Sequence, residues 1–194
     1  MGKIEQNKER KRRAILKAAQ GVFLPEGYLL ASMDKIADEA GVTKQTVYRY
    51  FPSKADLFQA TLSQMGKSSG GGFAVHLENP NAREALLGFA KGFMHFHLSD
   101  EHIAIFRLLV AEGTKVPEMT KSFLSVGPHD TDAALSSFLS ERFNIEETKT
   151  TIRLWTGMLL ALRSYVLMGM EKPSKEQIDN HAIDATDFLL AAIS

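Results

Sequence analysis

The chain has 194 residues, 44% of them hydrophobic and 24% charged, so it can bury a sizeable core and is neither disordered nor fibrous. It contains no cysteine, which excludes disulfide scaffolds, thiolate zinc sites and cysteine nucleophiles. The N-terminus has no apolar signal-peptide core, so we expect a cytoplasmic protein.

Charge is distributed unevenly along the chain, although 23 basic residues balance 23 acidic ones overall. Residues 1–54 hold eleven Lys and Arg against six Asp and Glu, a net charge of +5, which leaves −5 for the remainder. Such asymmetry indicates a module that binds nucleic acid or another anion, attached to a second part of different function. A basic N-terminal tail without a specific partner is the alternative explanation.

Hydrophobic spacing predicts an all-α fold. Apolar residues recur at helical intervals, and no segment shows the alternation of a strand. The residues that cap or break helices in the first third are Pro25 to Gly27, Ser32, Gly41, Thr43, Pro52 and Ser53. They predict four helices before residue 66, the first of which ends at Pro25 to Gly27.

Beyond residue 66 the chain is expected to continue as longer helices. Residues 66–72 are rich in glycine and serine, which predicts a loop between modules. The approximate helical spans that follow are 81–98, 100–114, 117–126, 129–142, 147–170 and 174–193, with breaks at Gly113, Pro117, Gly127-Pro128, Asn144 and Pro173. The most apolar segment, 154–170, is interrupted by Arg163 and is too short to span a bilayer, so it predicts a buried helix.

The second and third helices are each about two turns long and are joined by a glycine turn, which predicts a helix-turn-helix. In the third helix, Val47 is expected to face the first helix, while Lys44, Gln45 and Tyr48 share the opposite face. That face suits a DNA groove, because lysine can contact phosphate or guanine and glutamine can pair with adenine.

The segment from Ser32 to Phe58, SMDKIADEAGVTKQTVYRYFPSKADLF, closely resembles the DNA-binding head of the TetR family of bacterial transcriptional regulators. The resemblance extends back to Phe23 and Gly27-Tyr28, so it covers about the first 60 residues. It implies an all-α protein in which a helix-turn-helix head precedes a helical-bundle domain for regulation and dimerisation. A weaker resemblance to one C-terminal subtype of the family rests on residues 107–112, 117–119 and 127–128.

The resemblance also implies roles for nine side chains of the head. Those expected to contact phosphate are Ser32, Thr43, Tyr48, Tyr50 and Lys54. Those expected to read bases are Lys44, Gln45 and Thr46, and Arg49 suits either role. Purely structural roles are the alternative for Ser32 and Thr43, as helix caps, and for Tyr50 and Phe51, as packing residues.

From these features we expect a head at residues 1–54, a connecting helix and loop at 55–80, and a ligand-binding and dimerisation domain at 81–194. By resemblance, the helices near 147–170 and 174–193 form the four-helix bundle of a homodimer. The expected partners are a double-stranded DNA operator, a second copy of the chain and a small apolar or amphipathic effector. We expect no cofactor, metal or membrane partner.

Side chains of the later helices are candidates for an effector pocket. They are Phe89, Phe93, Phe96, His97, Phe106, Met119, Phe123, Trp155, Met158, Leu162 and Tyr165. Helical spacing makes core packing the alternative for each of them. The polar residues that could orient a ligand are His95, His97, Arg107 and Arg163, which the sequence does not rank.

These observations predict a sequence-specific transcriptional regulator, a repressor that a small-molecule effector releases from a palindromic operator. The alternatives are an activator, a ligand-independent regulator or, in another class, a small-molecule-binding helical enzyme with a vestigial head. Ser68 has the glycine spacing of a hydrolase nucleophile elbow, but that motif requires a preceding strand, so no enzyme is expected. His95, His97 and His102 suggest a metal site, which the different directions of His95 and His97 on a helix disfavour.

Overall fold

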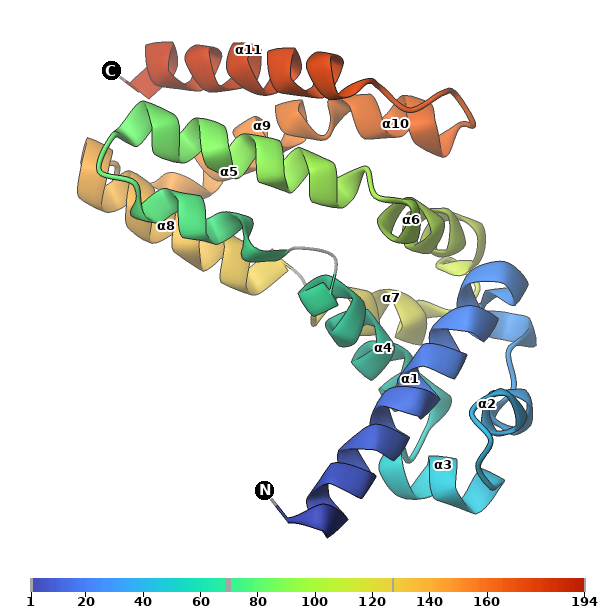
Figure 1. Cartoon of the computed structure of the whole chain (residues 1–194). Helices are drawn as coiled ribbons and strands as arrows, with labels where there is room; N and C mark the ends of the chain where they lie inside the picture. The colour runs from blue at the N-terminus through green and yellow to red at the C-terminus, as the bar shows by residue number, and fades with distance from the viewer. Residues whose placement is uncertain (1, 69–70, 127, 194) are drawn as a thin grey trace. The chain divides into compact units, whose positions relative to one another are not determined.

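The computed structural model describes residues 2–68, 71–126 and 128–193, and all regular secondary structure in these residues is helical, with no strand (Figure 1). The all-α prediction is therefore confirmed. The helices are α1 (Lys3–Leu30), α2 (Met33–Glu39), α3 (Lys44–Tyr50), α4 (Lys54–Ser68), the 3-10 helix η1 (Gly71–Glu78), α5 (Ala82–His97), α6 (Asp100–Glu112), α7 (Pro117–Leu124), α8 (Pro128–Phe143), α9 (Thr148–Leu159), α10 (Ala161–Leu167) and α11 (Lys175–Ile193). In this part of the chain, no helix has the length and apolarity needed to cross a membrane.

The helices pack into two compact units, each with its own hydrophobic core. The first, here called the head unit, comprises residues 1–65 and 104–126. The second, here called the bundle unit, comprises residues 66–103 and 127–194. Each unit is described by itself below.

An aromatic cluster holds the head unit together. Phe23 and Tyr28 of α1 stack with their ring centroids 5.7 Å apart, and Phe58 of α4 meets both rings edge-on at 5.1 and 5.2 Å. All three side chains are almost completely buried. Because burying an aromatic side chain contributes several kcal/mol, this cluster fixes α1 against α4.

The end of α1 agrees with the prediction in part. The backbone leaves helical geometry at Gly27, where φ is 87°, inside the predicted interval, but helical residues resume as far as Leu30. Pro25 itself lies inside the helix, because its fixed φ is compatible with helical geometry. The Glu112 carboxylate of α6 lies against this kink and accepts a 2.9 Å hydrogen bond from the Leu29 N–H.

The structure corrects three further predictions. The expected loop at 66–72 is too long, since α4 continues to Ser68 and η1 begins at Gly71. Ser69 and Gly70 of that loop, and the expected break at Gly127, lie outside the described residues. The expected helix 147–170 is divided at Leu160, where the Arg163 N–H bonds to the Leu160 carbonyl three residues back. Segment 154–170 is also buried on one face only, since apolar residues on its other face are exposed. These are Leu154, Tyr165, Met168 and Met170.

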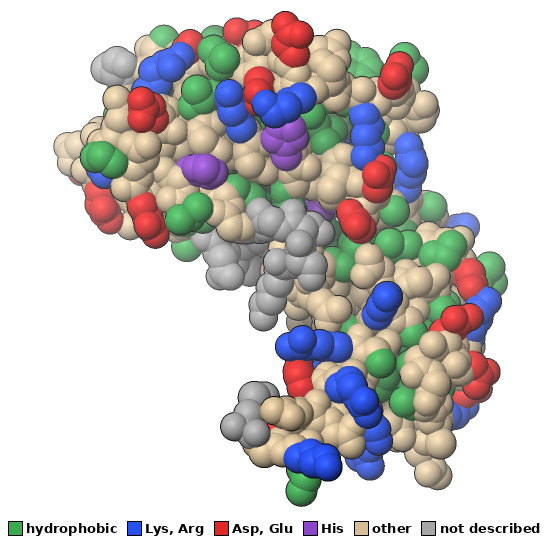
Figure 2. Space-filling view, in the orientation of Figure 1, with side chains coloured by type: hydrophobic (Ala, Val, Ile, Leu, Met, Phe, Trp, Pro, Cys, Tyr) green, Lys and Arg blue, Asp and Glu red, His purple; other side chains and the backbone are tan. Residues whose placement is uncertain are grey.

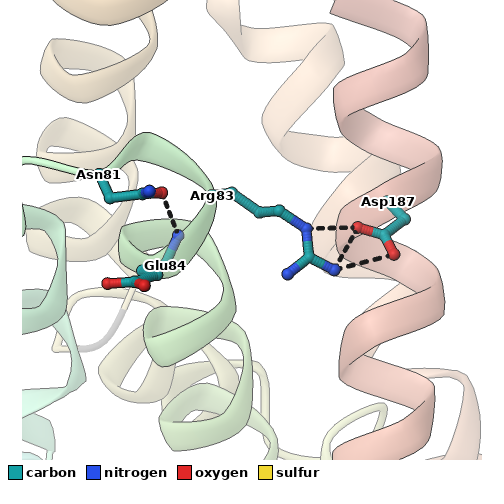
Figure 3. Close-up of polar contacts among 4 residues, drawn as sticks. All are labelled: Asn81, Arg83, Glu84 and Asp187. Carbon is teal, nitrogen blue, oxygen red and sulfur yellow. Dashed lines mark hydrogen bonds and ion pairs between the residues drawn. The ribbon is translucent and has the colours of Figure 1, made fainter.

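The bundle unit is built around α5, whose apolar face packs against η1, α9 and α11. Asn81 caps α5 by accepting a 3.0 Å hydrogen bond from the Glu84 N–H. At the surface, the Arg83 guanidinium forms two parallel 3.0 Å hydrogen bonds to the Asp187 carboxylate of α11 (Figure 3). This bidentate pair links α5 to α11 at the surface of the unit.

Two glycines of α1 provide a matched test of the kink. A Cβ at Gly27 would meet the Glu112 carboxylate and would hold a side chain at positive φ, whereas a Cβ at Gly21 would meet nothing within 4 Å. We expect Gly27→Ala to lower the free energy of unfolding of the head unit by about 1–3 kcal/mol. Gly21→Ala should raise it by about 0.5–1 kcal/mol, because alanine is the better helix former.

Urea unfolding followed by circular dichroism gives the free energy of unfolding of both glycine variants. If the two substitutions change it equally, Gly27 is not required for the kink in α1.

Candidate nucleic-acid interface and ligand site

Helix α3 presents the face that the sequence predicts. Gly41 adopts φ 64° in the turn before it, and Thr43 caps the helix by accepting a 3.2 Å hydrogen bond from the Thr46 N–H. Val47 is completely buried, which anchors α3 in the head core. The side chains on the other face are exposed, namely Lys44, Gln45 and Tyr48. Their donors and acceptors are therefore available to a macromolecule.

Lys44 has an internal partner in this structure. Its ammonium lies 2.8 Å from the Asp34 carboxylate of α2, and this hydrogen bond raises the pKa of Lys44 above its ordinary value. Both side chains are more than half exposed. Exposed ion pairs contribute little to stability, so the pair can open when a phosphate or a base competes for the lysine.

Basic residues of α1 lie beside α3. The Tyr50 hydroxyl donates a 3.3 Å hydrogen bond to the Lys8 carbonyl, and the Arg12 guanidinium stands 5.5 Å from the centre of the Phe51 ring. These contacts bring the basic end of α1 to the C-terminal end of α3, and Figure 2 shows Lys and Arg side chains gathered over this part of the head. A shallow depression beside them is lined by Lys11, Asp38, Gly41, Val42, Thr43 and Thr46.

Lys54 occupies an internal position between α1 and α2. Its ammonium donates hydrogen bonds to the carbonyls of Tyr28 at 2.7 Å, Ala31 at 3.0 Å and Leu29 at 3.4 Å. Partial burial lowers the pKa of Lys54, and the ammonium also stands 4.6 Å from the centre of the Tyr28 ring. Two other head residues have an expected role. Ser32 caps α2, and the Arg49 guanidinium lies over the Tyr50 ring.

The candidate ligand residues fall into two groups. Seven belong to the bundle unit and are buried or partly buried there: Phe89, Phe93, Phe96, His97, Trp155, Met158 and Leu162. Three belong to the head unit, namely Phe106, Met119 and Phe123. Tyr165 is 59% exposed, and so is not part of either core.

A polar cluster lies at the edge of the aromatic core of the bundle unit. His97 Nδ1 and His102 Nε2 are hydrogen-bonded at 2.8 Å, and Arg163 acts electrostatically on both rings. Burial, with smaller contributions from neighbouring charge, lowers the pKa of His97 to about 2 and that of His102 to about 4. Both imidazoles are therefore neutral near pH 7.

Comparisons with known proteins decide the family. The model of the bacterial regulatory proteins of the tetR family matches residues 15–61. The model of the AefR-like transcriptional repressor C-terminal domain matches residues 84–192, more than half of the chain. The chain belongs to the TetR family of bacterial transcriptional regulators.

Curated relatives match this TetR-family chain over short stretches. The transcriptional activator FasR of Mycolicibacterium smegmatis is 44% identical over 57 residues, which are 29% of this chain and 26% of FasR. The transcriptional repressor BepR of Brucella suis biovar 1 is 42% identical over 53 residues, or 27% of this chain and 25% of BepR. The matched stretch thus spans about a quarter of the length of either relative.

Solved structures match over almost the whole TetR-family chain. A TetR-family regulator from Mesorhizobium loti MAFF303099 has a TM-score of 0.81 and 24% identity, with 95% of this chain and 96% of that chain covered. The flavonoid-responsive regulator FrrA has a TM-score of 0.75 and 28% identity, with coverage of 95% and 97%. The Mesorhizobium loti structure shows the fold of this chain. Both matches cover the bundle unit as well as the head unit.

Sequence reasoning missed the residues that shape both sites from a distance. Glu112 and Glu118 hold the end of α1, since the Tyr28 hydroxyl donates a 2.8 Å hydrogen bond to Glu118. Phe73 of η1 joins the aromatic core from a segment that was expected to be a loop. Nothing local in the sequence marks these contacts, because each joins segments far apart along the chain.

The histidine pair predicts a loss of stability in acid. Between pH 6.5 and pH 4 His97 and His102 bind protons in the unfolded state but not in the folded state. The free energy of unfolding therefore falls as the pH drops through this range. Each group contributes at most about 1.4 kcal/mol per pH unit. We expect His102→Gln to reduce the acid-induced loss by about 1–3 kcal/mol relative to the wild type.

The control for this measurement is His95→Gln, because His95 is exposed on the same helix as His97. Urea unfolding at pH 7, 5.5 and 4 provides the comparison. The interpretation of the pair is wrong if both glutamine variants follow the wild-type pH dependence.

Proposed function

We propose that this TetR-family regulator acts in the cytoplasm as a homodimer that binds a near-palindromic operator and represses transcription until an effector releases it. The observation that carries the proposal is the exposed face of α3, held over the buried Val47 and flanked by the basic end of α1. In a symmetric dimer, two such helices enter successive major grooves about 34–36 Å apart.

The proposal assigns sequence reading to α3 and backbone contacts to its surroundings. Lys44, Gln45 and Thr46 read base edges, since their side chains project from the N-terminal turns of the helix. Ser32, Thr43, Tyr48, Tyr50 and Lys54 are the proposed phosphate contacts, with Arg49 in either role. For Lys54 this role requires the ammonium to leave the three carbonyl oxygens that it bonds. The competing explanation is that Lys54 supports DNA binding indirectly, by holding the junction between α1 and α2.

Functional domains are proposed at residues 1–54 for DNA binding, 55–80 for the connection, and 81–194 for ligand binding and dimerisation. The compact units divide the chain differently, because residues 104–126 pack with the head. A segment of the proposed regulatory domain therefore supplies part of the core on which α1 and α4 rest.

Dimerisation is proposed through the helices at 147–170 and 174–193. The support is apolar surface on these helices, where Leu154 of α9 is 58% exposed and Phe188 of α11 is 66% exposed. Tyr165 and Met168 add further exposed apolar surface at α10. Several large apolar side chains exposed on helices of one unit are consistent with an interface.

Release by an effector is supported by the match to a repressor C-terminal domain and by the name of the similar regulator FrrA, which is described as responsive to flavonoids. An effector can lower operator affinity only by as much as its own affinity differs between two conformations of the protein. The head match to the activator FasR favours activation as the second candidate, since the same DNA binding can act either way according to operator position.

Dimerisation is tested by placing a charge in the proposed interface. We expect Phe188→Asp to convert the dimer to a monomer, because a desolvated carboxylate in an apolar interface is strongly unfavourable. Val110→Asp is the matched control, since Val110 is 73% exposed but lies on α6, outside the proposed interface. Sedimentation velocity gives the oligomeric state, and a dimer that survives Phe188→Asp places the interface elsewhere.

Operator recognition is tested by selecting bound duplexes from a random DNA pool at a stated salt concentration. We expect an enriched inverted repeat. Lys44→Ala and Gln45→Ala should relax sequence preference, each costing about 1–3 kcal/mol at the base it reads. Binding without a consensus, or equal loss of affinity on specific and random duplexes, contradicts the roles given to these two side chains.

A further inference from the structure

The first three turns of α1 form a basic segment that lies outside the hydrophobic core of the head unit. Residues 3–13 hold six Lys and Arg against two Asp and Glu, and none of their side chains is buried. The first buried side chain of the helix is that of Ile15. Helices in proteins are stabilised mainly by packing an apolar face, and this segment packs none. Its surface is therefore available to a partner, and its charge favours a polyanion.

Two of the cations in this segment already have a partner within it. Arg10 donates a 3.0 Å hydrogen bond to the Asn7 side chain, and Arg13 donates one of the same length to the Glu9 carboxylate. Lys11 differs from them, because its exposed ammonium forms no hydrogen bond or ion pair with any residue that the structure describes. An outside anion can therefore bind Lys11 without breaking an internal ion pair.

Lys11 lines the shallow depression beside α3, together with residues of the turn that precedes this helix. On the α3 side, the depression is lined by Thr43 and Thr46. Their hydroxyl oxygens lie 2.9 Å apart, and either of them can be the donor of this hydrogen bond. A hydroxyl has one hydrogen to donate, so the pair uses one O–H and leaves the other for an outside acceptor. The depression thus offers an ammonium and an O–H donor, which together suit a phosphate oxygen.

One acidic side chain, that of Asp38 in α2, also lines the depression. Its carboxylate is exposed and repels an anion. With Lys11 and Asp38 together, the lining side chains carry no net charge, so the depression is a poor site for a free phosphate ion. A phosphate that belongs to a bound duplex is in a different situation, because other contacts of the duplex hold it there at high effective concentration. The depression therefore favours a DNA strand over a small anion.

We propose that Lys11 and the hydroxyl pair of Thr43 and Thr46 bind one backbone phosphate of the duplex that α3 reads, while Asp38 weakens that contact. Lys11 is not among the nine head residues to which the resemblance gives a role, so the site adds α1 to the DNA-binding surface. Because every phosphate is alike, the contact strengthens binding to all sequences and gives no preference among them. This inference rests on the proposed function in one respect, since it requires the exposed face of α3 to lie against a duplex.

The test follows binding of the full-length protein to the selected operator and to a random duplex, by fluorescence anisotropy over a range of salt concentrations. Lys11→Gln should weaken binding to both duplexes by the same factor. It should also lower the slope of log K against log salt by about 0.9 for each head, and hence by about 1.8 for a dimer. Lys17→Gln is the matched control and should leave the slope nearly unchanged, because Lys17 is an exposed lysine of the same helix outside the depression.

The acidic side chain of the depression provides a test of opposite sign. Asp38→Asn should tighten binding to both duplexes several-fold by a common factor, because an amide does not repel a phosphate. Glu39→Gln removes the same charge from the next residue, which is exposed but does not line the depression, and should have a much smaller effect. Circular dichroism verifies that all four variants, whose substituted residues are exposed, fold like the wild type.

Equal changes of slope in Lys11→Gln and Lys17→Gln would reduce the effect to the overall charge of α1 and overturn the site. An unchanged slope in Lys11→Gln, or a loss of affinity confined to the operator, would overturn it as well. A random-pool selection without a consensus refutes the proposed operator, while the two lysine variants on the random duplex still decide this site. A consensus without any difference between the lysine variants refutes only the site.

Discussion

The end of α1 is the constraint on which the head depends. A helix end leaves carbonyl and N–H groups without partners, and here charged side chains from distant segments provide them. Lys54 takes up the carbonyls, while Glu112 takes the Leu29 N–H beside the positive φ of Gly27. The direction in which the chain enters α2, and hence the position of α3, follows from these contacts. The presentation of the exposed face of α3 is therefore decided about fifteen residues before that helix begins.

The local features of the head could be predicted because each is encoded within a few residues. Ser32 and Thr43 cap the helices that follow them, and Gly41 provides the turn between those helices. The burial of Val47 follows from helical periodicity alone. Pro25 is a less decisive signal than Gly27, because the fixed φ of proline is compatible with a helix.

Features that depend on distant contacts could not be predicted in the same way. Segment 71–78 resembles a continuation of a glycine-rich loop, and only the presence of α5 makes η1 favourable by burying Phe73. The break at Leu160 contains no proline and leaves no local signal. The sequence identified His97 and Arg163 as polar candidates, but the pairing of His97 with His102 became evident only when α5 and α6 were placed together.

Under the proposed base-reading role of Lys44, its pairing with Asp34 has a consequence for how a duplex is read. In the free protein, the Asp34 carboxylate pairs with the lysine as a phosphate oxygen would. In that role, a duplex gains from Lys44 only the difference between the binding free energy it offers and what Asp34 already gives. Sequences that offer only a generic negative charge then gain little, and those that also place an acceptor in line with the ammonium gain more. On this proposal, an exposed ion pair that adds little to the fold disfavours indiscriminate binding.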